Sequence, residues 1–230
     1  MRLSSEVEDF STTEEPTYTY TQLSDEAKEI VKQWWYVNGA EHEWWDCAYE
    51  DFKRNGYDLG FVIDKINFSG FYSQGDGACW SGQVDVATWL KTHTEDSIAR
   101  EAWCALIAEE FCNKHFSIHF RGHYSHSNTM TCVGWDWVGE NGEQDYLYLT
   151  KPSIFKGMHY KELHNLIRST DFPYTDPNDI EEAAFNSAKD YADELYKQLR
   201  EEYEYITSEA NLIEMCDIND WRFDDEGRMV

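Results

Sequence analysis

The chain of 230 residues has 45 acidic and 19 basic residues, a formal net charge of −26, and its residues are 41% hydrophobic and 16% aromatic. This length suits one large domain, and the aromatic residues supply a bulky apolar core, so we expect a folded protein. The negative charge disfavours direct binding to nucleic-acid phosphates or to an anionic membrane, and it favours basic partners instead.

The first part of the chain predicts an arm followed by helices. Residues 1–22 are polar and rich in Ser, Thr and Glu, which is typical of a flexible acidic arm. From residue 23 to residue 230 we expect a single α+β domain. Apolar residues at helical spacing, each run ended by Asn-Gly, predict a helical hairpin over residues 23–56.

The middle of the chain alternates apolar and polar residues with a period of two, which predicts the sheet core over residues 61–150. Alternating runs begin near residues 64, 79, 114 and 131, and a hairpin signal at 140–143 leads to a short run at 146–149. These runs predict an antiparallel meander of four to five strands packed against several helices. A helix from residue 97 to about residue 111 is expected to cross the sheet, whose other face presents polar side chains.

The last part of the chain, residues 159–230, predicts an acidic helical region. A short helix at 161–167 precedes a capping box at 179–182, from which apolar residues at helical spacing predict a long amphipathic helix to about residue 205. A shorter helix at 209–216 and an extended tail follow. The outer face of the long helix is expected to be acidic and to bind a basic partner through Glu181, Glu182, Asp190, Asp193, Glu194 and Glu201.

Two polar turns interrupt the predicted strands. In the segment Ser73–Gly77, two glycines permit backbone angles closed to other residues, and a hydroxyl, an amide and a carboxylate lie within five positions. Such a loop can hold a polar ligand, or it can be a tight turn whose side chains bond their own backbone. A second turn follows at 122–128. The predicted ligand-binding residues are Ser69, Ser73, Gln74, Gly75, Asp76, Gly77, Arg121, His123, Tyr124 and His126.

The side chains of these turns suit a small polar or nucleotide-like ligand. Gln74 and Asp76 can bond a sugar hydroxyl or a base edge, and Tyr124 can stack on a planar ring. Two histidines of the second turn, His123 and His126, can hold a metal with Asp76 if the two turns meet, but nothing local requires this. We therefore expect no cofactor.

Six cysteines are spread along the chain without a C-x-x-C pair, so we expect reduced core thiols. The first residues lack the basic and then apolar pattern of a secretion signal. No apolar run approaches the ~20 residues of a membrane span. These features predict a cytoplasmic protein.

Three segments carry a resemblance to a known family. They are FSGFYSQGDGACW at 68–80 with a preceding I-x, RGHYSHSNTM at 121–130 and QLREEYEYITSE at 198–209. Over most of residues 45–228 the chain resembles a widespread family of uncharacterised bacteriophage and prophage proteins. The resemblance implies phage origin, a composite α+β domain and a place in the host cytosol, and it implies no assigned reaction.

Binding is the expected activity, and catalysis is not, because the chain lacks G-x-S-x-G and the glycine patterns of Walker and Rossmann sites. Small phage proteins often act on host machinery or host defence, so we predict a non-catalytic protein that captures its ligand at the SQGDG turn. Three alternatives stay open. The protein can be an acidic DNA mimic that inhibits a host nuclease or another basic nucleic-acid-binding protein, an antitoxin-like protein inhibitor, or a small hydrolase that uses Asp76 and His123.

Overall fold

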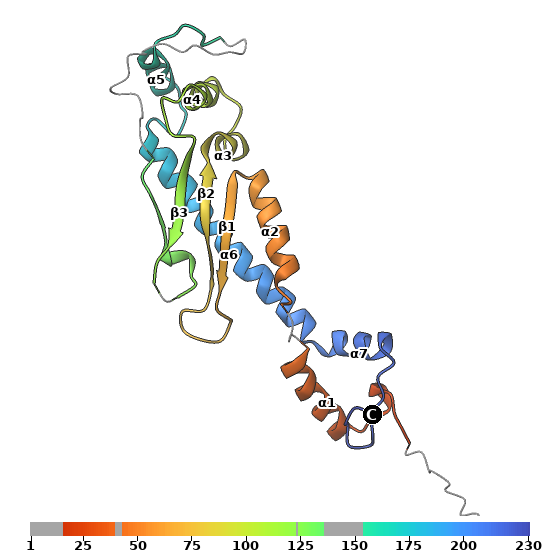
Figure 1. Ribbon diagram of the computed structural model, residues 1–230. Helices are drawn as coiled ribbons and strands as arrows, with labels where there is room; N and C mark the ends of the chain where they lie inside the picture. Colours follow the sequence, from red (N-terminus) through yellow and green to blue (C-terminus); the bar gives the residue numbers. More distant parts are fainter. Residues whose placement is uncertain (1–15, 40–42, 123, 136–153) are drawn as a thin grey trace, which may run out of the picture. The chain divides into compact units, whose positions relative to one another are not determined.

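The computed structural model describes residues 16–39, 43–122, 124–135 and 154–230 (Figure 1). The chain divides into two compact units: unit 1 comprises residues 1–44 and 201–230, and unit 2 comprises residues 45–200. We expected one domain from residue 23 onward, with a helical hairpin over 23–56. The two helices of that range belong to different units, because the first packs against the C-terminal helix and the second against the strand that directly follows it.

Unit 2 is built on a four-stranded antiparallel sheet in the order β1-β2-β3-β4. The strands are β1 (Phe61–Phe68), β2 (Ala78–Asp85), β3 (His115–Phe120) and β4 (Met130–Cys132). This sheet and the helices around it confirm the predicted α+β meander. The expected hairpin and strand at 140–149 lie outside the described residues.

The two faces of this sheet differ in polarity. Val84 of β2 pairs with Phe116 of β3, and both side chains are buried. Their neighbours Gln83 and His115 point to the opposite face and are exposed, as the period-two alternation requires. The sheet therefore has one face in the core and one polar face, as the sequence predicted.

Five helices accompany the sheet: α2 (Asp46–Asp58), α3 (Val86–His93), α4 (Ile98–Ala108), α5 (Tyr160–Arg168) and α6 (Pro177–Ile206). In Figure 1, α6 runs across one face of the sheet and α2 lies beside β1. The indole of Trp80 donates a hydrogen bond to the carbonyl of Ala188 on α6 at 3.1 Å. The rings of Phe61 and Tyr191 lie 5.3 Å apart. Because β1 and β3 run antiparallel to β2, which leads directly into α3, the loops that follow β1 and β3 lie at the end of the sheet away from α3.

Helix α3 was missed from the sequence because Val86 continues the alternation of β2. Asp85 ends the strand and caps the helix, since its side chain accepts a hydrogen bond from the backbone N–H of Thr88 at 2.8 Å. Aspartate is one of the residues preferred at the position that caps the start of a helix. The period-two pattern of the preceding residues concealed it.

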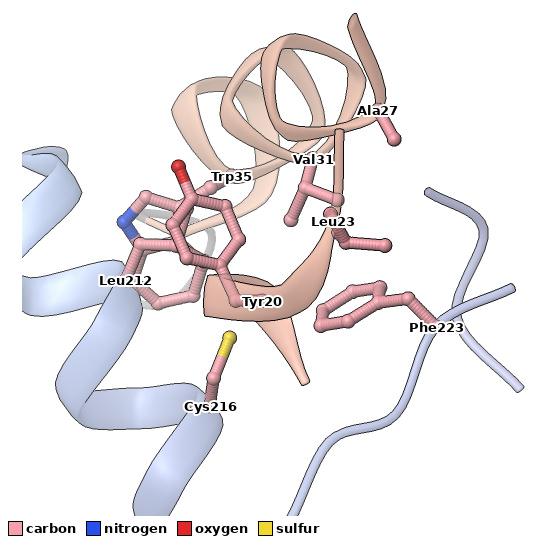
Figure 2. Close-up of a cluster of buried hydrophobic side chains, with 8 residues drawn as sticks. All are labelled: Tyr20, Leu23, Ala27, Val31, Trp35, Leu212, Cys216 and Phe223. Atoms are coloured by element: carbon pink, nitrogen blue, oxygen red, sulfur yellow. The ribbon is translucent and has the colours of Figure 1, made fainter. Parts of the chain in front are cut away.

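Unit 1 is helical and contains η1 (Tyr20–Gln22), α1 (Asp25–Asn38), the last six residues of α6 and α7 (Glu209–Ile218). Ser24 caps α1 by accepting a hydrogen bond from the N–H of Ala27 at 3.2 Å. The C-terminal segment joins through isolated β-bridges from Phe223 to Tyr18 and to Met229. Figure 2 shows the buried core of unit 1, formed by Tyr20, Leu23, Ala27, Val31, Trp35, Leu212, Cys216 and Phe223.

Within the described ranges, none of the helices combines the length and the apolar character that crossing a membrane requires. All six cysteines are free thiols, and Cys79, Cys112 and Cys216 are buried.

Candidate functional site

The glycine-rich loop between β1 and β2 is closed by its own carboxylate. Asp76 Oδ2 accepts hydrogen bonds from the backbone N–H groups of Tyr72 at 2.8 Å and Ser73 at 2.6 Å. The N–H of Asp76 donates in turn to the carbonyl of Ser73 at 3.1 Å. Charged acceptors make the stronger hydrogen bonds of a turn, so this carboxylate stabilises the loop. Of the two uses foreseen for the turn, the geometry favours the structural one for Asp76.

The two glycines of this loop permit a close contact with the loop between β3 and β4. Gly75 has φ +92°, and a Cβ at this position would lie 2.3 Å from a ring carbon of Tyr124. A Cβ on Gly77 would lie 2.5 Å from the carbonyl oxygen of Ser125. Only glycine allows the second loop to pack so closely against the first. The glycine pattern is thus explained by contact between the two loops.

The remaining predicted ligand residues surround this contact. Four cavities lined by described residues, of about 490, 470, 260 and 70 Å³, are all formed elsewhere. His126 is half-buried, and its Nδ1 accepts a hydrogen bond from the backbone of Asn128 at 3.1 Å. His123 lies outside the described residues. The exposed members of the set are Ser69, Ser73, Gln74, Arg121 and Tyr124.

The structure therefore brings Gly75, Gly77, Tyr124 and His126 together, although they come from turns about 50 residues apart in the chain. Asp76 Oδ2, in contrast, is bonded to the backbone of its own loop. Within the described ranges, no group of three or more His, Cys, Asp or Glu side chains is arranged to hold a metal ion.

One residue of the predicted acidic face, Glu181, serves the fold instead. Its carboxylate accepts hydrogen bonds from the backbone N–H of Trp135 and from the thiol of Cys132, the latter at 3.5 Å. Burial, with the nearby Glu181 carboxylate as a second cause, raises the pKa of Cys132 to about 11. Because Glu181 faces the end of the sheet, it is removed from the set of partner-binding residues.

The rest of that face is exposed but of mixed charge. Glu182, Asp190, Asp193 and Glu194 share the outer stripe of α6 with two lysines and Arg200, so residues 182–200 carry a formal charge of only −1. Glu194 also lies 4.0 Å from the ammonium group of Lys197. The unit 2 part of α6 is therefore not the strongly acidic surface that we expected.

The negative charge is concentrated in the last 30 residues, which belong to unit 1. This segment begins at Glu201 and contains ten acidic residues and two arginines, a formal charge of −8. Both arginines pair within the segment, Arg222 with Asp220 and Arg228 with Glu226, each at 2.5 Å. The two arginines therefore neutralise carboxylates of the same segment, and Glu201, Glu202, Glu204 and Asp217 are exposed to solvent.

A hydrogen-bonded cluster ties α1 to α7 within this acidic unit. Glu209 accepts a hydrogen bond from the hydroxyl of Tyr20 at 2.7 Å and pairs with the ammonium group of Lys32 at 3.0 Å. These two donors hold the pKa of Glu209 below its ordinary value of 4.5. The same cluster borders a cavity of about 490 Å³ whose walls include Trp35, Tyr36 and Leu212 as well as Glu29.

Unit 2 has a cavity of its own, of about 470 Å³, between the start of α4 and the segment before α6. Its walls carry carboxylates, hydroxyls and the rings of Phe172 and Tyr174. His93 lines one side, stacks on Trp89 with 5.1 Å between ring centroids, and has a pKa lowered by burial. The sequence offered no signal for this cavity, since its residues are separated by about 75 positions and share no motif.

The described residues thus define an α+β domain with a four-stranded antiparallel sheet, accompanied by a small and strongly acidic helical unit. The chain belongs to the family described as Domain of unknown function (DUF8835), which matches residues 44–209. No curated protein and no solved structure matched the chain. The matched range contains all of unit 2, whereas α1 and residues 210–230 of unit 1 lie outside it.

Proposed function

We propose that the protein is a non-catalytic binding protein and that the acidic surface of unit 1 engages a basic partner. The observation that carries this proposal is the charge of −8 over residues 201–230, where both arginines are paired internally. A surface of one sign raises the rate of encounter with a partner of the opposite sign and selects against other partners. Single exposed ion pairs contribute only about 0–1 kcal/mol, so the effect depends on the number of carboxylates.

The class of partner that fits is a basic protein, such as one that binds nucleic acid. Such a protein presents Lys and Arg at the spacing of phosphates, and a dense group of carboxylates can occupy the same surface. Following the resemblance to phage and prophage proteins, we propose that this partner belongs to the host cell. The DNA-mimic interpretation is accordingly placed ahead of ligand capture, because Asp76 is used by its own loop.

Charge-neutralising variants of equal net charge test this proposal. The first variant changes five exposed carboxylates of unit 1 to their amides: Glu201, Glu202, Glu204, Asp217 and Asp225. The control changes five exposed carboxylates of unit 2: Asp58, Asp171, Glu182, Asp190 and Asp193. Binding of a labelled lysine peptide of about 20 residues is measured by fluorescence anisotropy at about 0.05 and about 0.5 M salt.

The unit 1 variant should bind the lysine peptide about tenfold more weakly, and the control should change little. Binding of the unaltered protein should weaken steeply as salt rises, because the screening length shortens. Equal loss in both variants, or binding that salt does not affect, would remove the proposal. For a partner identified in a host lysate, displacement by duplex DNA would support the DNA-mimic form.

A second candidate function is capture of a nucleotide-like ligand by the two loops that meet at Gly75. Tyr72 and Tyr124 are 76% and 57% exposed there, and Gln74 and Arg121 lie on the same two loops. Aromatic faces and an arginine suit a base and a phosphate. Mass spectrometry of the supernatant after heat denaturation tests this function. A nucleotide that is released by the unaltered protein and not by Tyr124→Ala supports it. The function is rejected if neither protein releases a nucleotide.

A further inference from the structure

Helix α1 carries two apolar stripes. One is buried in the core of unit 1, and the other is partly exposed, with the ring of Trp34 lying 5.7 Å from that of Trp221. Ala27, Val31 and Trp35 point into the core (Figure 2). A second stripe, the outer stripe, consists of Ile30, Trp34 and Val37, which are 50%, 39% and 71% exposed. Their i, i+4, i+7 spacing places them along one face of the helix. Single exposed hydrophobic residues are common, but a periodic set on one face is typical of a docking surface.

Two residues of the outer stripe, Ile30 and Trp34, border a groove of about 260 Å³ between α1 and the C-terminal segment. The third, Val37, lines the cavity of about 490 Å³ described above. The base of the groove includes the buried residues Val31 and Phe223, and Ile30, Trp34 and Met229 rise at its sides. This volume lies below the range of about 300–1,000 Å³ that is usual for small-molecule sites. The groove is therefore sized for one or two apolar side chains of a partner.

The wall opposite α1 is a turn held in place by its own hydrogen bonds. Asp224 Oδ1 accepts hydrogen bonds from the N–H groups of Glu226 at 3.0 Å and Arg228 at 2.8 Å. Gly227 has φ +82°, and a Cβ there would lie 2.5 Å from the carbonyl oxygen of Ala27. Glycine thus lets the turn lie directly against α1. A groove shaped in advance loses less conformational entropy when it binds.

Charge around the groove selects its occupant. Glu26 and Glu29 are exposed on α1, Asp225 is exposed on the turn, and Arg228 at the edge is paired with Glu226. A second copy of the chain is a poor occupant, because unit 1 has 20 acidic and five basic residues, a formal charge of −15. Two such surfaces repel each other, and an anionic lipid surface is repelled in the same way. A basic segment with an apolar face has the complementary chemistry.

We infer that the outer stripe and the adjoining groove bind an amphipathic, basic helical segment of the partner. One or two apolar side chains of the segment enter the groove, and its Lys and Arg residues lie against Glu26, Glu29 and Asp225. This is the helix-in-groove mode of recognition, in which apolar anchors supply affinity and the surrounding charges fix orientation. The inference rests on the proposed function and specifies the partner.

Two labelled peptides and three variants test the inference. One probe is an amphipathic peptide of leucine and lysine, about 18 residues or five helical turns long, and the other is the lysine peptide described above. The double variant Ile30→Ser/Val37→Ser removes apolar surface from the stripe, and Met229→Ser removes it from the opposite wall. The control is Ile218→Ser, which changes a residue of α7 that is 68% exposed and lies outside the groove.

The double variant should bind the leucine-lysine peptide about tenfold more weakly and the lysine peptide unchanged. Met229→Ser should weaken the leucine-lysine peptide several-fold, and Ile218→Ser should not affect either peptide. Unchanged binding of the leucine-lysine peptide by both the double variant and Met229→Ser would overturn the inference and leave the electrostatic proposal standing. Failure of both peptides to bind the unaltered protein would reject the proposed function and the inference together.

Discussion

The contact between the loops at Gly75 and Tyr124 makes a strong prediction about stability. Substitution of Gly75 by Ala places a Cβ 2.3 Å from the Tyr124 ring in a backbone conformation with φ +92°. Two effects therefore add: the left-handed backbone strains an alanine, and the ring must move. Gly122 provides a matched control, because it has φ +102° and a Cβ there would meet nothing within 4 Å.

The magnitudes follow from these two effects. Backbone strain costs about 1–2 kcal/mol and applies to both Gly75→Ala and Gly122→Ala. The steric overlap applies only to Gly75→Ala and adds about 1–3 kcal/mol, depending on how far the half-exposed ring of Tyr124 can turn away. In a background that carries Tyr124→Ala, the second term should disappear and Gly75→Ala should cost no more than Gly122→Ala.

Amide hydrogen exchange of β1 and β2 measures the free energy of unfolding of unit 2 without interference from unit 1. The unaltered protein, Gly75→Ala, Tyr124→Ala and the variant with both changes form a double-mutant cycle. Gly122→Ala is a separate reference that measures backbone strain alone. If Gly75→Ala lowers the free energy no more than Gly122→Ala, or if Tyr124→Ala restores nothing, the two loops are not in contact as described. The explanation given for the glycine pattern would then fail.

Three further predictions follow from the contacts of single side chains. The hydrogen bond from Tyr20 and the ion pair with Lys32 lower the pKa of Glu209, so they stabilise unit 1 above the unfolded pKa near 4.5, and this stability is lost as the pH falls through the lower folded pKa. Glu209→Gln should therefore flatten the acid limb of unfolding followed by circular dichroism. Trp80→Phe removes a buried hydrogen bond to a backbone carbonyl of α6 and should lower the free energy of unfolding, measured by urea titration, by about 1–3 kcal/mol. A loss under about 0.5 kcal/mol would contradict the packing of α6 on the sheet. Glu181→Ala leaves two donors near the end of β4 without their acceptor and should lower the free energy of unfolding, measured by hydrogen exchange, by about 1–3 kcal/mol. Glu182→Ala should be close to neutral, and equal effects of the two changes would refute the assignment of Glu181 to the fold.

Local patterns in the sequence determined most of the secondary structure. The alternation around Phe116 and Ile118 placed β3, and the serine before Asp25 placed the start of α1, because a strand face and a helix cap depend on residues a few positions apart. The capping box at 179–182 located the start of α6 within two residues. The glycine-rich turn was recognised as distinctive for the same local reason.

Only the tertiary structure decided what these elements do. The role of Glu181 depends on a backbone group 46 residues earlier in the chain, and the need for glycine at position 75 depends on a ring 49 residues later. The division into two units, and with it the concentration of charge in unit 1, required the N-terminal helix to meet the C-terminal segment. Such meetings depend on how the whole chain closes on itself, and periodicity or spacing within a short window carries no information about them.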